Sequence, residues 1–544
     1  MKKYISILFL VAAFLLSLSS CKKSFLKEEV YSSYAPETLS DSLGLEASLS
    51  GLYNHFSNFY TYSDNQGWLA VWQVGTDVAF SVPSQTQGVE IPYSNYNSLI
   101  STDFAASYTW SYAYRMINNA NVIIANVENP NLGGMSQAGK NGINAEARFF
   151  RGYAYNMLAT FFGRVPLITS PITAPKTNFV RASLDSINSQ VETDLNFAVT
   201  NLPDIDNVKS NSKGKMYQRV SKYAAQQLFA EAYLRMGKND LAEQQAQAVI
   251  SSGKFSLNTT RYGTRGNQPG DPFSDMFIYG NQRRSQGNKE SIWVLEMENP
   301  STVPGGITNN PQQRRIWGAA YYQVTGMKIA DSLGGRGISR LRLSNWVLYG
   351  LYPAGDMRNS QYNIRRQYWY NDPASPKYKQ PIPYAGSDTL FRLTPHTTKW
   401  YDLLANNADG EFGFAMTKDI ILMRLGETYL LLAEALVKQS KLQGAADAIN
   451  ALRTRADAPQ VTPAEMSLNF ILDERARELI GEENRRMTLM RTGKLVERAL
   501  ALNANNGTGT TPIVGLTNKN LLLPIPKNEI DLNKDARLDQ NEGY

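Results

Sequence analysis

The feature that most limits the possible folds is an internal repeat of alanine-rich sequence. Phe229-Ala230-Glu231-Ala232 aligns with Leu432-Ala433-Glu434-Ala435. At the same offset the alignment continues with Ala242 and Ala445, Ala246 and Ile449, and Val249 and Leu452. Small residues where two helices cross, with larger apolar residues further on, are typical of tetratricopeptide-like helical hairpins. Any antiparallel helix pair would share the alanines, so an ordinary helical hairpin stays open as the alternative.

Helical periodicity extends beyond the repeat. From Ile143 the apolar residues recur in steps of four and three, and the run stops at Gly163 and Pro166. We expect two further helical hairpins, at residues 143–199 and 468–500, which gives about four units. The sequence therefore predicts a mainly α fold on a tetratricopeptide-like scaffold, with few short strands.

The segment from about residue 253 to residue 418 has a different character. Glycines and prolines interrupt every long helical pattern, and one short strand is expected at residues 292–295. Long irregular segments in compact proteins are usually functional or disordered, and the many aromatic residues here argue against disorder. We expect residues 254–418 to be a loop-rich insertion that covers the helical scaffold and carries recognition.

The N-terminus indicates where the protein works. Lys2 and Lys3 precede an apolar run that ends in small residues before Cys21. This order is typical of a bacterial lipoprotein signal, and Cys21 is the single cysteine, so it cannot form an internal disulfide. We predict that Cys21 is acylated, with palmitate among its chains, and anchors the protein in a membrane. An ordinary secretory peptide is the alternative. The expected organisation is a signal peptide at 1–20, a lipid-tethered linker at 21–36 and a single domain at 37–544.

Composition excludes several functions. The formal net charge of +7 is scattered along the chain rather than gathered in blocks, so we expect no nucleic-acid partner. His55 and His396 are the only histidines, and the usual zinc and haem spacings are missing. We therefore expect no metal and no cofactor.

Several segments resemble, in order along the chain, the signature motifs of the SusD/RagB family of outer-membrane lipoproteins. These segments are Ala145-Glu146-Ala147-Arg148-Phe149-Phe150-Arg151-Gly152-Tyr153, Asp356-Met357-Arg358, Ile421-Leu422-Met423-Arg424-Leu425-Gly426-Glu427, Glu474-Arg475-Ala476-Arg477-Glu478-Leu479 and Leu523-Pro524-Ile525-Pro526-Lys527. The resemblance implies non-catalytic capture of an oligosaccharide or similar nutrient at the cell surface. It also implies delivery of that nutrient to a SusC-like, TonB-dependent transporter barrel in the outer membrane.

Candidate ligand contacts are chosen by position and residue type. The resemblance implies two contact regions, one after the first long helix and one in the central insertion. Tyr and Trp rings stack on the C–H faces of sugars, while carboxylates and amides bind hydroxyls. The predicted contacts are Trp68, Asp77, Tyr93, Tyr96, Trp317, Tyr321 and Tyr322. Core packing explains each of these aromatic residues equally well, and Asp77 fits a helix cap. Trp110, Trp293 and Trp346 are assigned to packing.

Two other functional classes stay open. A peptide-binding tetratricopeptide-type adaptor would concentrate its ligand-facing residues on the repeat helices. A lipoprotein glycoside hydrolase would need two carboxylates beside a cleft, and Glu296 and Glu298 follow the expected strand on one face. No recognisable catalytic motif accompanies this pair, so we expect a binding protein rather than an enzyme.

Overall fold

The structure is a computed structural model. It describes residues 42–61, 71–82, 89–208, 219–298, 313–383, 389–401, 416–503 and 513–544. Within these ranges the chain is mainly helical with few short strands, which confirms the predicted fold class. Cys21, Trp68, the expected signal peptide and the expected linker lie outside the described residues.

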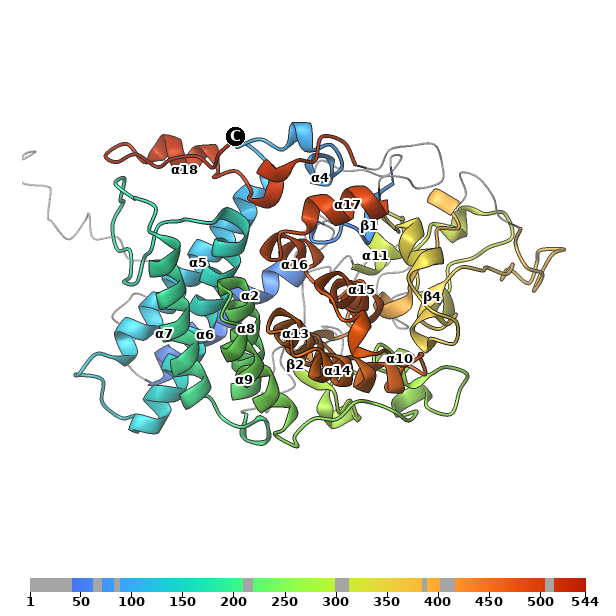
Figure 1. The fold of residues 1–544 in the computed structure, drawn as a ribbon, viewed down its shortest axis with the longest axis horizontal. Coiled ribbons are helices and arrows are strands. Elements are labelled where there is room, and N and C mark those ends of the chain that lie inside the picture. The colour runs from blue at the N-terminus through green and yellow to red at the C-terminus, as the bar shows by residue number, and fades with distance from the viewer. Residues whose placement is uncertain are drawn as a thin grey trace, which may run out of the picture.

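Long helices form one side of the molecule (Figure 1). They are α2 (Ser42–Thr61), α5 (Phe104–Val127), α6 (Gln137–Phe162), α7 (Leu184–Asn201), α8 (Lys222–Met236) and α9 (Asn239–Ile250). The helix α6 contacts both α5 and α7. Its first turn is capped by the Ser136 side chain, which accepts a hydrogen bond from the Gly139 amide, and it ends at Gly163, whose φ of 69° suits glycine. The hairpin expected at residues 143–199 is therefore present as α6 and α7.

The internal repeat corresponds to two neighbouring helical hairpins. The first is α8 and α9, and the second is α13 (Leu425–Lys438) and α14 (Leu442–Arg455). The helix α13 contacts α9, α8 and α14, so the hairpins lie side by side. Ala242 and Ala445 occupy equivalent positions and are both fully buried. Their small side chains allow the paired helices to approach closely.

The last helical unit differs from the expected simple hairpin. It contains α15 (Leu468–Leu479), α16 (Arg485–Arg491) and α17 (Leu495–Asn503), and the short helix α18 (Lys527–Leu532) follows near the C-terminus. Gly481 and Gly493, with φ of 79° and 67°, lie in the two turns between α15, α16 and α17. Glycine adopts these positive φ values without strain, which divides the segment into three helices.

The central segment is irregular, as expected. Its described residues contain only short elements. Most of them lie on the side of the molecule opposite α5–α7, whereas β2 lies in the middle beside α13 (Figure 1). The short helices here and near residue 90 are α4 (Ile91–Ser94), α10 (Pro272–Asp275) and α11 (Gln313–Trp317). The strands are β1 (Ala79–Ser81), β2 (Ser291–Leu295), β3 (Leu341–Leu343), β4 (Ile364–Arg365), β5 (His396–Thr397) and β6 (Ile420–Arg424). They form three antiparallel pairs, β1 with β3, β2 with β6, and β4 with β5. The strand expected at 292–295 is β2.

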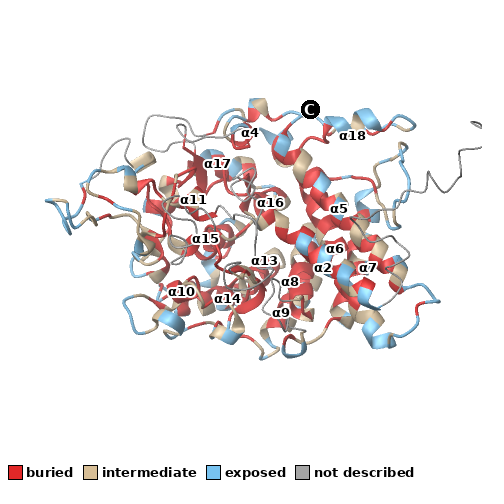
Figure 2. Cartoon of the chain, turned by 180° about the vertical axis from the view of Figure 1, so that it is seen from behind, coloured by how far each residue is buried: buried red, intermediate tan, exposed pale blue. Residues whose placement is uncertain are grey.

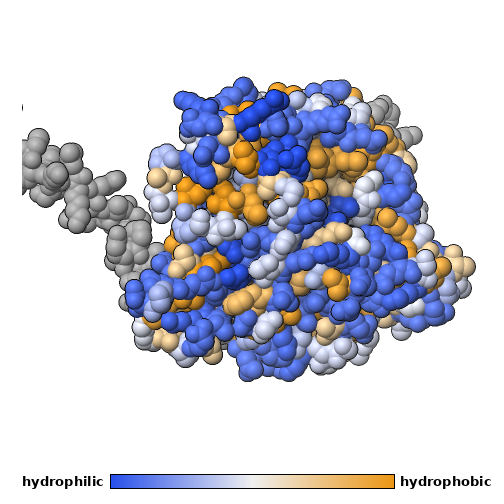
Figure 3. Space-filling model, turned by 60° about the vertical axis from the view of Figure 1, so that its left-hand side comes forward, coloured by the Kyte–Doolittle hydropathy of each residue, from blue (hydrophilic) through white to orange (hydrophobic). Residues whose placement is uncertain are grey.

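Burial differs between the helices of the C-terminal half and those at the outer side of the molecule. The helices α13, α15 and α16 are largely buried, whereas α7 is exposed along its outer side (Figure 2). The side that carries α5–α7 has a mainly hydrophilic surface with a few apolar patches (Figure 3). In the described part of the chain, every helix is too short or too polar to cross a bilayer.

Candidate ligand-binding site

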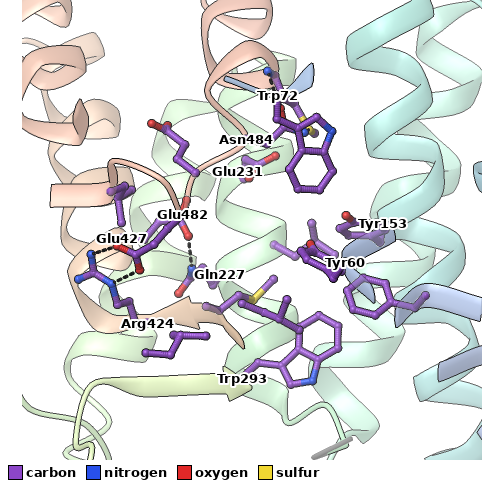
Figure 4. A pocket seen from close by; sticks show the side chains of 18 residues that line it. Tyr60, Trp72, Tyr153, Gln227, Glu231, Trp293, Arg424, Glu427, Glu482 and Asn484 are labelled. Carbon is purple, nitrogen blue, oxygen red and sulfur yellow. Dashed lines mark hydrogen bonds and ion pairs between the residues drawn. The ribbon is translucent and has the colours of Figure 1, made fainter. Parts of the chain in front are cut away.

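A cavity of about 100 Å³ lies where α2, α6 and α8 meet β6 and the turn before α16 (Figure 4). This volume is several times what one water molecule needs. Tyr60, Tyr153, Glu231 and Asn484 line the cavity and are only partly buried, so its lining reaches solvent. The cavity therefore combines protein walls with access for a ligand.

One wall of the cavity is aromatic. Tyr60, Trp72, Tyr153 and Trp293 come from four separate segments and surround the same space (Figure 4). Trp72 stacks on Phe59, with ring centroids 4.5 Å apart, and this contact fixes the orientation of the indole ring. The wall is therefore made of large rings that are held in place before a ligand arrives.

The opposite wall is polar and rigidly held. Arg424 donates from Nε and Nη2 to the two Glu482 oxygens, at 2.8 and 3.0 Å (Figure 4). Gln227 Nε2 donates to Glu427 Oε2 at 2.9 Å, and Arg475 Nη2 donates to Glu427 Oε1 at the same distance. These bonds fix the carboxylates without using all of their acceptor sites. The wall can therefore accept hydrogen bonds from the hydroxyl groups of a ligand.

Two carboxylates of this wall, Glu427 and Glu482, differ in their electrostatics. Burial raises the pKa of Glu427, although Arg475 opposes the shift, and the charges of Glu231 and Glu483 raise it further. Burial also acts to raise the pKa of Glu482, but Arg424 and Lys399 outweigh it and hold that pKa below its usual range. Arg424 and Lys399 therefore keep Glu482 ionised.

Comparison with known proteins identifies the family. A family model described as the SusD family matches residues 341–544, and a second, described as "Starch-binding associating with outer membrane", matches residues 24–234. The chain belongs to the SusD/RagB family. The resemblance found in the sequence motifs is therefore confirmed, and as a member of this family of binding proteins the chain is not an enzyme.

Individual relatives share the whole architecture. "SusD-like protein P25" of Formosa agariphila is 26% identical to this chain, and the alignment covers 94% of each chain. A solved structure described as a laminarin binding SusD-like protein is 24% identical, with a TM-score of 0.67 over 93% of this chain and all of that one. Surface glycan-binding protein A from Bacteroides fluxus is 21% identical, with a TM-score of 0.69 over 92% of this chain and 99% of that one. These two structures have the same SusD fold.

The SusD motif residues make buried ion pairs between elements. Arg151 on α6 donates to both oxygens of Asp194 on α7, at 2.8 and 2.7 Å. Arg358, in the Asp-x-Arg motif, donates to Glu478 Oε2 on α15 at 3.0 Å as well as to Asp356. These motifs therefore hold the scaffold together.

In the first predicted region, the structure encloses the residues chosen as ligand contacts. Asp77, Tyr93 and Tyr96 have no exposed surface. Tyr93 donates to Asp103 Oδ2 at 3.0 Å, and Tyr96 donates to the Gly75 carbonyl at 3.0 Å. Their rings pack in the core, which disfavours them as ligand contacts.

The second predicted region is also mainly buried. Trp317 is 3% exposed and Tyr321 is fully buried, with the Tyr321 hydroxyl donating to the Gly335 carbonyl at 2.8 Å. Tyr322 is half-buried, and the Arg336 guanidinium lies 5.5 Å from its ring centroid. Trp317 and Tyr321 are buried and do not line the cavity of Figure 4, which disfavours them as ligand contacts, while ligand contact by Tyr322 stays a prediction.

The acidic pair considered for catalysis has a structural environment. Arg283 lies 3.4 Å from Glu296 and 3.0 Å from Glu298, and its Nε donates to Asp419 at 2.6 Å. One guanidinium thus gathers three carboxylates beside β2. This group connects the residues that follow β2 with the residue that precedes β6, and it does not line the cavity of Figure 4.

The cavity residues themselves were missed by the sequence analysis. Trp293 was assigned to packing, and it is indeed 2% exposed, but its ring also borders the cavity. Glu231 and Glu427 were noted only as parts of the repeat and of a motif. Glu231 lies within α8 and Glu427 lies in the first turn of α13, and nothing in the sequence indicates that the two side chains face one space.

Proposed function

We propose that this SusD family protein binds an oligosaccharide without chemical change and passes it to a TonB-dependent transporter barrel in the outer membrane. The observation that carries the proposal is the cavity of Figure 4, in which fixed aromatic rings face fixed carboxylates. Two structural neighbours whose names state laminarin or glycan binding support the same ligand class.

The two walls match the two chemical aspects of a sugar. A pyranose ring presents C–H groups, which contact the faces of Trp72 and Tyr60, and hydroxyls, which donate to Glu231 and Glu427. Tyr and Trp supply large contact areas while few side-chain rotations are frozen on binding. The limited volume admits one end of an oligosaccharide, and the rest of the ligand extends along the partly exposed lining.

Location and partner follow from the family and from the N-terminal sequence. The description of one matching family model places the family at the outer membrane. Acylation of Cys21 would anchor the chain there, with the domain facing the exterior. A tethered binding protein raises the local concentration of its ligand beside a transporter barrel. To deliver the ligand, the binding protein then has only to release it to the transporter, without any chemical change of the ligand.

Native affinity electrophoresis tests the binding part of the proposal. The purified domain is run in gels that contain laminarin, starch, galactan or xylan, with a peptide mixture as a further arm. Retardation by at least one polysaccharide, without shorter products in the gel, supports glycan binding. Retardation by peptides alone would favour the adaptor alternative.

The transporter is tested with the full-length protein. Outer membranes are solubilised, the tagged protein is captured, and the co-purified proteins are identified by mass spectrometry, with Cys21→Ala as the control. We expect a β-barrel transporter with the wild type. Recovery of the wild type from the soluble fraction would contradict the membrane assignment.

A further inference from the structure

A second cavity, of about 130 Å³, lies in the irregular half of the molecule, near α10 and β4–β5. It shares no lining residue with the cavity of Figure 4. Its charged lining residues are Arg261, Arg265, Arg365 and Asp275, which are three guanidinium groups and one carboxylate. The lining thus carries two more positive than negative charges.

The single carboxylate of the lining, Asp275, is paired with Arg261. Arg261 donates to both oxygens of Asp275, at 2.7 and 2.9 Å, and the Tyr262 amide donates to the same group at 3.0 Å. Asp271 is near this group but does not line the cavity, and it accepts hydrogen bonds from Ser360 and Asn363. Neither carboxylate therefore pairs with Arg265 or Arg365.

Arg365 is held by neutral groups. Its Nε donates to the Tyr401 hydroxyl at 2.7 Å, and that hydroxyl lies 2.9 Å from His396 Nε2. His396 Nδ1 lies 2.9 Å from the Thr394 carbonyl, which can only accept, so Nδ1 carries the proton and Nε2 accepts from Tyr401. Burial lowers the pKa of His396 to about 4, which keeps the ring neutral. The chain of bonds orients Arg365 without cancelling its charge.

Arg265 supplies a second free cation. In the part of the chain that the structure describes, its guanidinium has no hydrogen bond or ion pair, while its carbonyl accepts from Arg261. The side chain is half-buried at the edge of the cavity. A guanidinium in this position has all five N–H donors available for an anion.

We propose that this cavity binds an acidic group of the glycan, a carboxylate or a sulfate ester on a sugar ring. Planar guanidinium groups bind such oxyanions through paired hydrogen bonds. Tyr279, Tyr362 and Tyr401 line the same space and supply the aromatic surface that a sugar ring contacts. The inference rests on the proposed function, and it names an anionic glycan as the ligand class.

Calorimetry with matched ligands tests the proposal. Tetragalacturonate is compared with its methyl ester, and a sulfated galactan tetrasaccharide is compared with its desulfated form, with inorganic sulfate alone as a further arm. The variant Arg265→Gln removes a cation whose guanidinium has no hydrogen bond or ion pair to any described residue. Arg537→Gln is the control, because it removes the same charge from a side chain that is 90% exposed and lies in the C-terminal segment.

We expect wild type to bind at least one acidic tetrasaccharide about tenfold more tightly than its neutral form, and Arg265→Gln to lose that preference. Arg537→Gln should keep it. Equal affinity of wild type and Arg265→Gln for the acidic ligands, or preference for the neutral forms, would overturn the inference while the proposed function stands. Equal affinity for inorganic sulfate and the sulfated tetrasaccharide would assign the cavity to the free anion. Binding of no glycan at all, here and in the affinity gels, would overturn the proposed function itself.

Discussion

Asp77 and Arg485, which are distant in the sequence, form a bidentate ion pair in the core. Arg485 Nε donates to Asp77 Oδ1 at 2.8 Å and Nη2 donates to Oδ2 at 2.6 Å. Arg498 Nε adds a third bond to Oδ2 at 2.7 Å. Burial acts to raise the pKa of Asp77, but the two arginines outweigh it and hold that pKa below its usual range. The pair fastens the segment after α2 to α16 and α17.

Replacement of Asp77 should destabilise the fold. In Asp77→Asn two buried guanidinium groups lose the carboxylate that they share, while Arg485 keeps Glu483 and Arg498 keeps Asp473 as a partner. Breaking a buried ion pair costs up to about 3–5 kcal/mol in the free energy of unfolding. Urea unfolding followed by circular dichroism measures the change. Asp531→Asn is the control, because the Lys527–Asp531 pair is more than half exposed and should contribute less than about 1 kcal/mol. Equal stability of the two variants would contradict the structural role of Asp77.

A close backbone approach makes a second stability prediction. A Cβ at Gly75 would lie 1.7 Å from the Tyr93 carbonyl oxygen, and Gly75 has a φ of 63°. Gly75→Ala should therefore cost about 3 kcal/mol or more, the sum of backbone strain and overpacking. Gly237→Ala has a similar φ of 76° but open space around the Cβ, so it should cost only about 1 kcal/mol. Thermal unfolding of the two variants compares them, and similar midpoints would contradict the predicted clash.

The scaffold could be predicted from the sequence because its signals are local. The α8–α9 and α13–α14 hairpins follow from apolar spacing within each segment, and the strand at 292–295 follows from a short run of apolar and aromatic residues. The division of residues 468–500 into three helices was missed. It depends on turns at Gly481 and Gly493, whose positive φ values are not visible in the sequence.

The candidate site was harder to predict because burial is a tertiary property. Tyr93 and Tyr96 have the residue type and position of sugar platforms, yet Arg486 covers them. Its guanidinium lies 4.4 Å from the Tyr93 ring centroid and donates to the Tyr96 hydroxyl at 2.8 Å. Nothing near residues 93–96 in the sequence indicates this distant arginine.

The acidic group beside β2 predicts a pH dependence. Burial raises the pKa of Glu296 to about 7 despite Arg283, and the charges of Asp419 and Glu298 raise it further. Between the ordinary pKa of 4.5 and pH 7 the folded state keeps a proton that the unfolded state has lost. The free energy of unfolding should therefore fall as pH rises through this range, by at most about 3 kcal/mol from this group.

The variant Glu296→Gln isolates that effect. It cannot titrate, so its stability relative to wild type should increase steadily from pH 4.5 to 7. Burial lowers the pKa of His396 to about 4, which gives a slope of opposite sign, but both proteins share this contribution and it cancels in the difference. Urea unfolding at four pH values measures the difference. A constant difference would show that Glu296 is ionised in the folded protein throughout this range.

The polar wall of the cavity predicts a loss of affinity without a loss of stability. Glu231 is half-buried and accepts a hydrogen bond from Asn156 Nδ2 at 3.2 Å. Glu231→Gln keeps the size of the side chain but removes a charged acceptor for ligand hydroxyls, so glycan affinity should fall about threefold to tenfold. Surface plasmon resonance measures the affinity. Glu497→Gln, on a half-exposed side chain of α17 that does not line the cavity, is the matched control and should bind like wild type.

The most direct test is calorimetric titration of wild type, Trp72→Ala and Trp369→Ala with the glycan that retards the protein in affinity gels. Trp72 belongs to the aromatic wall, whereas Trp369 is 42% exposed and does not line the cavity. All titrations are run well below each variant's unfolding midpoint, because loss of a packed indole also lowers stability. The account predicts saturable binding by wild type, an affinity at least about tenfold lower for Trp72→Ala, and unchanged affinity for Trp369→Ala. Unchanged affinity for Trp72→Ala would contradict the assignment of this cavity as the binding site.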